Sequence, residues 1–378
     1  MTKKVIASDE IKKRNRQSIY KYIRENTALS KQEISFGLHL SLPTVSQNIQ
    51  YLTETGLIEK ASSDIKTGGR NATSYACVPN HKVAIGIYLT ANHINGVAVN
   101  LLGQIIGSKK LKISFAIDHD QYLKEIADVV ESIKIASHIS DEALLGVGIA
   151  VPGLISEEGE EVIYGYSLNF TGKTRAEITK YIPYHNLLLH DSFVAGYAEV
   201  WSNQDIENAF YISLNKSVGG CFIVNRQIYA GNSKKGGEIG HMTVVMENGK
   251  KCFCGQYGCF DTVANTSNLD KYTNGDLSDF FDLVKRKDLN AQNIWHEYLK
   301  KLSLAIHNIR LLFDCDIIIG GNVGEYMEEY QEDLFQLIDT KYPFAHFAKD
   351  YIHPCKYKTE ATPTGAALRL IDKYVNRI

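Results

Sequence analysis

The sequence CFCGQYGC occupies residues 252–259, a short way after the sequence GEIGH at residues 237–241. The three thiols of the first segment and the imidazole of the second make a complete ligand set for a tetrahedral structural zinc ion: His241, Cys252, Cys254 and Cys259. Glycines between the cysteines allow a short loop to fold tightly around one ion. Because protein side chains fill all four positions, no open position remains for a water molecule. We therefore predict structural rather than catalytic zinc.

The composition of the chain is typical of a soluble globular protein of two or three domains. The chain has 378 residues, of which 44% are hydrophobic and 22% charged. No stretch approaches the 18 consecutive apolar residues of a membrane span, so we expect no membrane partner. The first residues, MTKKV, lack an apolar secretory core, and we expect a cytoplasmic location. In that compartment clustered cysteines favour a metal over disulfides.

Charge is distributed unevenly along the chain. Residues 1–80 carry 12 Lys and Arg against 7 Asp and Glu, a balance of +5, while the rest of the chain has a balance of −7. A basic N-terminal segment on an acidic body indicates that only one end meets a polyanion. Taken alone, the charge favours the simpler interpretation of a solvated charged surface.

The N-terminal segment has the pattern of a winged helix-turn-helix. Apolar residues at helical spacing predict a helix through residues 11–23. Ser30, with Glu33 three residues later, predicts a capping box at the start of a second, short helix. A third helix is predicted from Ser41 to Thr55, and Gly56 is expected just past its end. Two strands follow, around a Gly-Gly-Arg turn, and form the predicted wing.

The third helix is the predicted recognition helix. Gln and Asn side chains can pair with adenine edges, and Ser and Thr can bond bases or phosphates. Arg70, at the tip of the wing, is placed to enter a minor groove. The alternative is a three-helix packing module that binds no DNA; the agreement of helices, wing and charge favours operator DNA as a partner. The predicted DNA-binding residues are Ser41, Thr44, Ser46, Gln47, Asn48 and Arg70.

From residue 81 onward, short β-rich runs alternate with helical stretches. Strands are predicted at 83–89, 94–100, from 105, and at 144–151, with a helix at 122–136. The pattern then partly repeats, with strands at 210–214, 220–224, 227–229 and from 316. Two βββαβ halves predict a duplicated α/β body with a cleft between two lobes, and such clefts are the usual small-ligand sites. The glycine-containing stretch from 364 opens a C-terminal helix that is expected to pack on the first lobe.

Four motifs together resemble the ROK family, which groups sugar-responsive repressors with sugar kinases. They are the cysteine loop, Glu-x-Gly-His at 238–241, Ala-Val-Pro-Gly at 150–153 and Gly-Ala-Ala at 365–367. The resemblance covers residue 81 to the end and implies an actin-like, hexokinase-like fold of two lobes. The expected divisions are a winged helix-turn-helix at 1–80, lobe 1 at 81–195 completed by a helix at 362–378, and lobe 2 with the zinc loop at 196–361. The winged helix resembles the repressor branch.

The resemblance also implies a set of sugar-binding residues. The family's Asn-Asp pair reads His190-Asp191 here, and the acid after the zinc loop, commonly Glu, is Asp261. Carboxylates and amides suit sugars because each can bond several hydroxyl groups. His241 is implied to bind zinc through one ring nitrogen and to face the sugar with the other, which links the metal to the pocket. The implied sugar-binding residues are Asn169, His190, Asp191, Glu238, His241 and Asp261.

The phosphate-binding turns of the family's kinases are eroded in this chain. Where an Asp-x-Gly-Gly-Thr turn would follow the first strand, the sequence at 88–92 is YLTAN, and the second turn reads NKSVGG at 215–220. Asp191 occupies the position of the catalytic base. Without phosphates opposite this carboxylate, it can only bind a sugar. We therefore expect no enzyme activity and no catalytic residues.

Three functions remain open from the sequence. The first is a sugar-responsive DNA-binding regulator, a repressor of carbohydrate uptake or catabolism genes such as those of xylose metabolism. The second is an ATP-dependent sugar kinase with an appended DNA-binding arm, and the third is a DNA-binding protein whose body serves only to oligomerise. The lost phosphate turns argue against the second, and the retained Asp191, Glu238 and His241 argue against the third. The expected partners are operator DNA, a sugar or sugar-phosphate effector, and a second copy of the chain in a homodimer or dimer of dimers.

Overall fold

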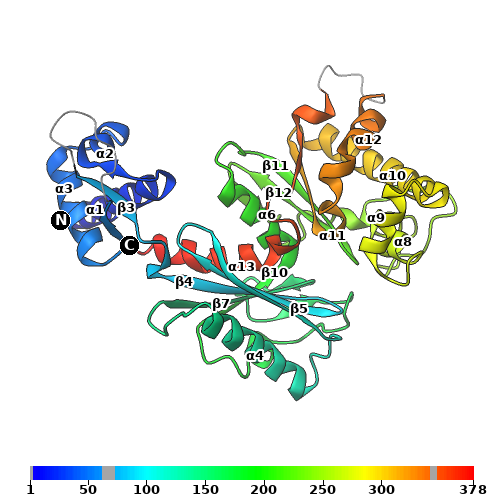
Figure 1. Ribbon diagram of the computed structural model, residues 1–378, viewed down its shortest axis with the longest axis horizontal. Helices are drawn as coiled ribbons and strands as arrows, with labels where there is room; N and C mark the ends of the chain where they lie inside the picture. The colour runs from blue at the N-terminus through cyan, green and yellow to red at the C-terminus, as the bar shows by residue number, and fades with distance from the viewer. Residues whose placement is uncertain (1–2, 62–72, 341–346) are drawn as a thin grey trace.

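The computed structural model describes residues 3–61, 73–340 and 347–378, and it is a mixed α/β protein with an N-terminal helical unit beside a two-lobed body (Figure 1). This is the predicted fold class. No helix within the described residues is long and apolar enough to cross a membrane.

The N-terminal unit consists of three helices and a small antiparallel sheet. The helices are α1 (Lys3–Glu25), α2 (Lys31–Gly37) and α3 (Leu42–Glu54). The strands β1 (Leu29–Ser30), β2 (Ile58–Lys60) and β3 (Ser74–Cys77) are arranged in the order β1-β3-β2. The paired strands β2 and β3 are the predicted strands of the wing, while the wing tip lies outside the described residues.

The sequence signals at the helix ends are confirmed. The Ser30 hydroxyl accepts from the Glu33 backbone NH, and the Glu33 carboxylate accepts from the Ser30 NH at 2.7 Å, which is the predicted capping box of α2. Ser41 caps α3 in the same manner, through the Thr44 NH. Gly56 follows α3 with a φ of 73°, a conformation that glycine adopts without strain.

Each lobe of the body contains a five-stranded mixed sheet, and the two sheets have the same topology. The first sheet has the order β6-β5-β4-β7-β10 and the second the order β13-β12-β11-β14-β15, so corresponding strands follow one another identically along the chain. The predicted duplication is therefore confirmed. The strands of the first sheet are β4 (Val83–Leu89), β5 (His93–Asn100), β6 (Ile105–Lys112), β7 (Leu144–Val151) and β10 (Asn186–His190). Those of the second are β11 (Ala209–Leu214), β12 (Val218–Val224), β13 (Gln227–Tyr229), β14 (Asp316–Gly320) and β15 (Ile352–Pro354).

Helices cover both faces of the first sheet. Helix α4 (Asp120–Ala136) packs against β5 and β6 on one side, and α13 (Ala361–Val375) packs against β4 and β7 on the other. Because both faces are covered, β4 is buried along its whole length and reads as a continuous apolar run. A Cβ atom at Gly86 of β4 would lie only 1.7 Å from the Pro363 carbonyl oxygen, so glycine allows the helix to approach this closely. The C-terminal helix thus packs on the first lobe, as predicted.

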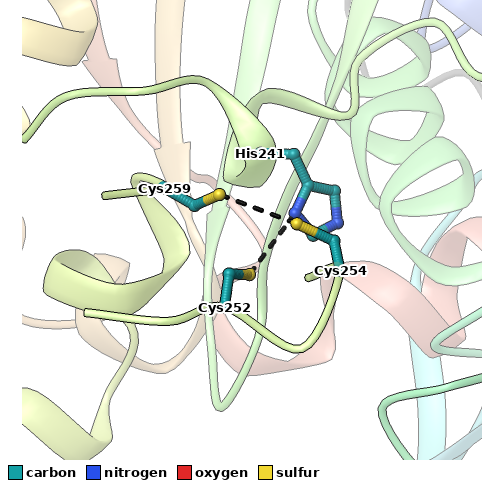
Figure 2. Close-up of side chains that lie close together, drawn as sticks. All are labelled: His241, Cys252, Cys254 and Cys259. Carbon is teal, nitrogen blue, oxygen red and sulfur yellow. Dashed lines mark hydrogen bonds between the residues drawn. The ribbon is translucent and has the colours of Figure 1, made fainter. Parts of the chain in front are cut away.

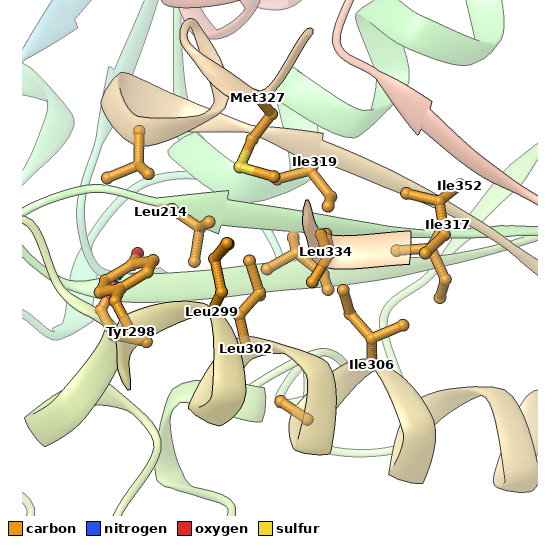
Figure 3. Packing of buried hydrophobic residues seen from close by; sticks show 14 of the residues in the cluster. Leu214, Tyr298, Leu299, Leu302, Ile306, Ile317, Ile319, Met327, Leu334 and Ile352 are labelled. Atoms are coloured by element: carbon orange, nitrogen blue, oxygen red, sulfur yellow. Dashed lines mark hydrogen bonds between the residues drawn. The ribbon is translucent and has the colours of Figure 1, made fainter. Parts of the chain in front are cut away.

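The second lobe has a large helical core beside its sheet. Helices α9 (Leu277–Lys285), α10 (Leu289–Phe313) and α12 (Met327–Asp339) contribute apolar side chains to one cluster with strands β11 and β14. Figure 3 shows the part of this cluster that α10, α12 and the strands form. Leu302 and Ile306 of α10 are fully buried in the same cluster as Ile317 of β14.

The shorter elements of the body are β8 (Leu154–Ile155), β9 (Val162–Tyr164), α5 (Arg175–Ile178), α7 (Asp261–Ala264), α8 (Ser267–Asp270), α11 (Gly321–Gly324) and 3₁₀ turns at 79–81, 239–241, 348–350 and 358–360.

The N-terminal unit packs on the end of the body where α13 finishes (Figure 1). One apolar cluster contains buried residues of both parts, including Ile23 of α1, Leu101 after β5 and Val375 of α13. Two side chains of α1 also donate to Asn376: Gln17 to its carbonyl at 2.7 Å and Lys21 to its side-chain oxygen at 3.0 Å. The two ends of the chain are therefore joined by both apolar and polar contacts.

Candidate functional site

The three cysteines and the histidine of the sequence motif form one cluster (Figure 2). Their ligand atoms all lie within 4.8 Å of one another. The Cys252 Sγ is 3.6 Å from the His241 Nδ1, and the Cys254 Sγ is 3.7 Å from the Cys259 Sγ. This arrangement of donors could hold a metal ion.

Backbone hydrogen bonds and glycines shape the loop that carries the cysteines. The Cys252 NH donates to the Gln256 carbonyl at 2.8 Å, which closes a tight turn. Gly258 has a φ of 74°, and a Cβ atom there would lie 1.9 Å from the Val245 carbonyl oxygen. A side chain at 258 would therefore push the loop apart, so glycine is needed for Cys259 to reach the cluster.

Burial raises the pKa of two thiols of the cluster. It raises the pKa of Cys252, and it raises the pKa of Cys259 to about 12. Since a thiol coordinates a metal as the thiolate, metal binding here would displace protons and would weaken as the pH falls.

A strip of polar side chains connects the cluster to the first lobe. The His241 Nε2 lies 3.9 Å from one oxygen of Glu238, and the other oxygen of Glu238 lies 3.8 Å from the His190 Nε2. The His190 Nδ1 is in turn 3.8 Å from Asp191. His190 and Asp191 come from the end of β10, whereas Glu238 and His241 belong to the turn after β13, so side chains of the two lobes meet here. Four of the six residues implied for sugar binding are thus brought together.

The junction of β10 with helix α6 (Asp191–Ser202) positions His190 and Asp191. The His190 Nδ1 accepts from the Phe193 NH at 3.4 Å and so caps the helix, which fixes the orientation of the ring. The Asp191 Oδ1 accepts from the Ser192 NH at 2.6 Å, while its Oδ2 accepts from the Tyr88 hydroxyl at 3.0 Å. Both oxygens of Asp191 therefore have a donor from the chain itself.

Tyr88, the first residue of the eroded phosphate turn at 88–92, is a member of this site that the implied sugar-binding set did not include. Its side chain is buried, and burial, followed by the negative charge of Asp191, raises the pKa of its hydroxyl well above the ordinary value. The phenol therefore stays protonated and remains a donor. Parallel pairing could have indicated the contact, since Tyr88 lies beside Ala150 and Ala150 beside Leu189, next to the predicted pair.

Asp261 and Asn169 have different surroundings. Asp261 is buried, and one of its oxygens accepts from the Val218 NH at 2.6 Å; burial raises its pKa. This carboxylate therefore braces the turn between β11 and β12. Asn169 is exposed, with a φ of 54°, and within the described residues no hydrogen bond or ion pair joins its side chain to the polar strip.

The outward face of α3 contains most, but not all, of the side chains predicted to contact DNA. Ser41 and Gln47 are exposed, and Thr44 and Ser46 are half-buried. The placement of Asn48 on this face is wrong: its side chain is 6% exposed and donates to the Thr44 carbonyl at 2.8 Å. The 3.6-residue period turns position 48 toward the core beside Val45 and Ile49. Arg70 lies outside the described residues.

Helix α6 runs from the polar strip to the N-terminal unit. Its 12 residues span about 18 Å and cross the predicted lobe boundary at 195/196. Near its far end, the indole of Trp201 lies under the guanidinium of Arg24, with 4.8 Å between the guanidinium carbon and the ring centroid. Glu199 of α6 is buried, and its carboxylate accepts hydrogen bonds from the backbone NH groups of Lys356 and Tyr357. These two residues precede α13.

Comparisons with known proteins agree with this architecture. The model of the ROK family matches residues 84–373. The xylose repressor of Caldicellulosiruptor bescii is 22% identical over 387 residues, with 96% of each chain covered. A crystal structure of a ROK family transcriptional regulator, a homolog of the E. coli MLC protein, has a TM-score of 0.70 at 21% identity and covers 97% of each chain. A ROK family glucokinase from Streptomyces griseus, in complex with glucose and AMPPNP, has a TM-score of 0.63 at 18% identity and covers 76% of this chain and 98% of its own. Since the family model spans well over half of the sequence, this chain belongs to the ROK family.

Proposed function

We propose that this protein is a sugar-responsive transcriptional repressor that acts in the cytoplasm on genes of carbohydrate uptake or catabolism. One observation supports this proposal above the others: helix α6 begins at the polar residues His190 and Asp191 and ends against α1 of a winged helix-turn-helix. Relatives that align over the whole length include one named xylose repressor, so D-xylose is the first effector to test.

The polar strip supports sugar binding. Its carboxylates and imidazoles offer several acceptors and donors at fixed positions, as the neighbouring hydroxyl groups of a sugar require. We propose His190, Asp191, Glu238 and His241 as the central contacts. Asn169 and Asp261 are proposed as flanking contacts, with one oxygen of Asp261 already committed to Val218.

We propose that zinc is the ion of the cysteine cluster. Ligand distances of 2.3 Å for sulfur and about 2.05 Å for nitrogen give tetrahedral edges of about 3.8 Å between sulfurs and about 3.6 Å between sulfur and nitrogen. The separations of 3.7 and 3.6 Å in the cluster fit these values. Zinc would fix His241 and the loop that leads to Asp261, and it would have a structural role.

We propose that the protein does not phosphorylate sugars. Two of its own contacts cross the second phosphate turn: the Lys216 ammonium pairs with buried Asp270 at 2.9 Å, and the Asn215 side chain accepts from the Asn322 NH at 2.8 Å. Phosphoryl transfer depends mainly on positioned phosphates and neutralised charge, and these contacts instead engage two side chains of the turn with other parts of the chain. Residue 191 would then be a binding group only.

The proposed response is a population shift between two arrangements of the lobes. A sugar held between His190 and Glu238 would favour one arrangement. Helix α6 would transmit the difference to α1 through Trp201 and, through Glu199, to the segment that precedes α13. A coupling of about 1–3 kcal/mol is sufficient for a useful switch. In a homodimer, or a dimer of dimers, the change in lobe arrangement would alter the spacing of two recognition helices on operator DNA.

The DNA-binding side of the proposal rests on residues 1–80. We propose that Ser41, Thr44, Ser46 and Gln47 meet the major groove and that Arg70 meets the minor groove. The proposed divisions of the body remain 81–195 with 362–378 for lobe 1, and 196–361 for lobe 2.

The test is a titration of operator binding against sugars. The purified protein is first used to select its own binding sequence, and the affinity for that DNA is then measured with D-xylose, D-glucose, N-acetylglucosamine and their phosphates. We expect one of them to weaken DNA binding at least fivefold. Unchanged affinity across the whole panel would contradict the effector role.

The alternative, a sugar kinase with a DNA-binding arm, is favoured by the retained Asp191. It predicts ATP-dependent phosphorylation that disappears in Asp191→Asn. A robust activity with that dependence would replace the repressor proposal.

A further inference from the structure

We propose that Tyr88 is a positioning residue of the effector site, which holds Asp191 as a fixed acceptor for a sugar hydroxyl without any cation. The inference rests on the proposed sugar-binding function and deepens it. It begins from the 3.0 Å hydrogen bond between the Tyr88 hydroxyl and the Asp191 Oδ2.

The packing around Tyr88 fixes the ring. Its side chain belongs to a small apolar cluster with Ala150 of β7, Val194 of α6 and Ala366 of α13. Two of these neighbours are alanines, which leave room for an aromatic ring between the sheet and two helices. Since a buried ring in such a close-packed site has few alternative rotamers, the hydroxyl is held at one position, facing Asp191.

The donors to Asp191 leave it free for about one further hydrogen bond. A carboxylate has about four lone-pair sites. Among the described residues three donors occupy these sites: the Ser192 NH at 2.6 Å, the Ser192 hydroxyl at 3.3 Å and the Tyr88 hydroxyl at 3.0 Å. One site therefore remains for a sugar hydroxyl, and its direction is set by the three donors already present.

The chemistry of a phenol explains why this position suits binding rather than phosphoryl transfer. An acid at position 88 would place a second carboxylate beside Asp191, and two such charges repel unless a cation lies between them. Tyr88 is neutral and stays protonated, because burial and the Asp191 charge raise its pKa. The Tyr88 hydroxyl is a hydrogen-bond donor to Asp191 and so stabilises this carboxylate, as a metal ion would otherwise do. The site therefore needs neither magnesium nor nucleotide.

The experiment is a double-mutant cycle on sugar affinity, with Tyr88→Phe, Asp191→Ala and the double variant. Phenylalanine keeps the ring in the apolar cluster and removes only the hydroxyl. The ligands are D-xylose, D-glucose and N-acetylglucosamine, measured by calorimetry without added metal or nucleotide. Tyr122→Phe is the matched control, because Tyr122 is also buried and its hydroxyl has no hydrogen-bond partner among the described residues. Thermal melting followed by circular dichroism checks that each variant is folded.

We expect Tyr88→Phe to weaken sugar binding about tenfold, the effect of losing one hydrogen bond to a charged group. In the Asp191→Ala background the same change should alter affinity less than twofold, because Tyr88 acts through Asp191. The role of Tyr88 would be overturned if Tyr88→Phe lowered sugar affinity equally in the wild-type and Asp191→Ala backgrounds, or if Tyr88→Phe alone left the affinity unchanged. Either result would leave the proposed sugar site intact. If no sugar binds to the wild type, the proposed function fails and the role of Tyr88 fails with it.

Discussion

The guanidinium of Arg24 lies over the indole of Trp201, with 4.8 Å from the guanidinium carbon to the ring centroid. Arg24 belongs to α1 of the N-terminal unit, and Trp201 is the penultimate residue of α6, whose first residue, Asp191, is part of the polar strip. The Trp201 ring also fills the space beside Gly103, where a Cβ atom would lie 2.0 Å from it. One aromatic side chain therefore contacts the N-terminal unit and the turn after β5 at the same time.

Trp201→Ala is expected to uncouple the two ends of the protein. Operator affinity and sugar affinity should each change little, because Trp201 contacts neither ligand, whereas the effect of sugar on operator affinity should fall several-fold. Cation–π contacts of this kind contribute about 0.5–2 kcal/mol, comparable to the coupling that a switch needs. Trp201→Phe keeps an aromatic ring under Arg24 and should retain most of the response. A full response in Trp201→Ala would exclude this contact from the coupling.

Cys254→Ser is expected to remove the bound metal and to loosen the loop that leads to Asp261. Three remaining ligands hold zinc far less tightly than four, so the metal content of the purified protein should fall from one zinc per chain toward zero, as measured by plasma mass spectrometry. Cys315→Ser is the control, because Cys315 is a buried thiol outside the cluster. Absence of zinc from the wild-type protein would contradict the assignment of the ion.

Gln47→Ala and Asn48→Ala should have different effects, although the two residues are adjacent. The exposed Gln47 is free to meet a base, and its loss should cost about 1–3 kcal/mol of operator binding and relax specificity at one base pair. Asn48 is buried and its side chain donates a hydrogen bond within α3, so its loss should lower the melting temperature of the N-terminal unit. Binding-site selection with each variant, together with thermal melting, separates the two outcomes. Relaxed base preference in folded Asn48→Ala would show that position 48 reaches the DNA.

The buried Glu199 is expected to make stability depend on pH. Burial raises its pKa above the usual value, so the folded state holds the proton more tightly than the unfolded state does. Glu199 therefore makes its full contribution to the free energy of unfolding at a pH below its pKa in the unfolded state. This contribution is lost as the pH rises through the raised pKa that Glu199 has in the folded state. Melting temperatures measured across this range should fall less steeply with rising pH in Glu199→Gln than in the wild type.

Glu33→Gln provides a comparison of opposite sign. The Ser30 backbone NH lowers the pKa of Glu33 in the folded state. Glu33 therefore stabilises the folded state at a pH above its pKa in the unfolded state, and this stabilisation is lost as the pH falls through the lowered pKa of the folded state. The variant should therefore be relatively less stable at neutral pH and should differ least from wild type in acid. Parallel profiles for wild type and Glu199→Gln would contradict the role given to the buried carboxylate.

The sequence by itself determined the local structure and the membership of the cysteine–histidine cluster. The capping box of α2 and the helix end at Gly56 follow from residues within one or two turns, because a hydroxyl, a carboxylate or a glycine acts on its immediate backbone. The strands 83–89 and 144–151 were predicted to the residue, since a run buried on both faces is apolar throughout. The cysteine spacing likewise required a tight loop, whatever the rest of the fold.

Only the tertiary structure decided which distant groups touch. The helical period of Val45, Ile49 and Leu52 places position 48 on the inner face of α3, but only the packing of α3 against α1 and α2 buries the polar side chain of Asn48 there. The contacts of Tyr88 with Asp191, and of Trp201 with Arg24, join residues more than 100 positions apart, and they depend on strand register and on how two units dock. Local sequence sets backbone conformation through short-range sterics and hydrogen bonds, whereas contacts between remote side chains arise only when the sheets and helices have packed.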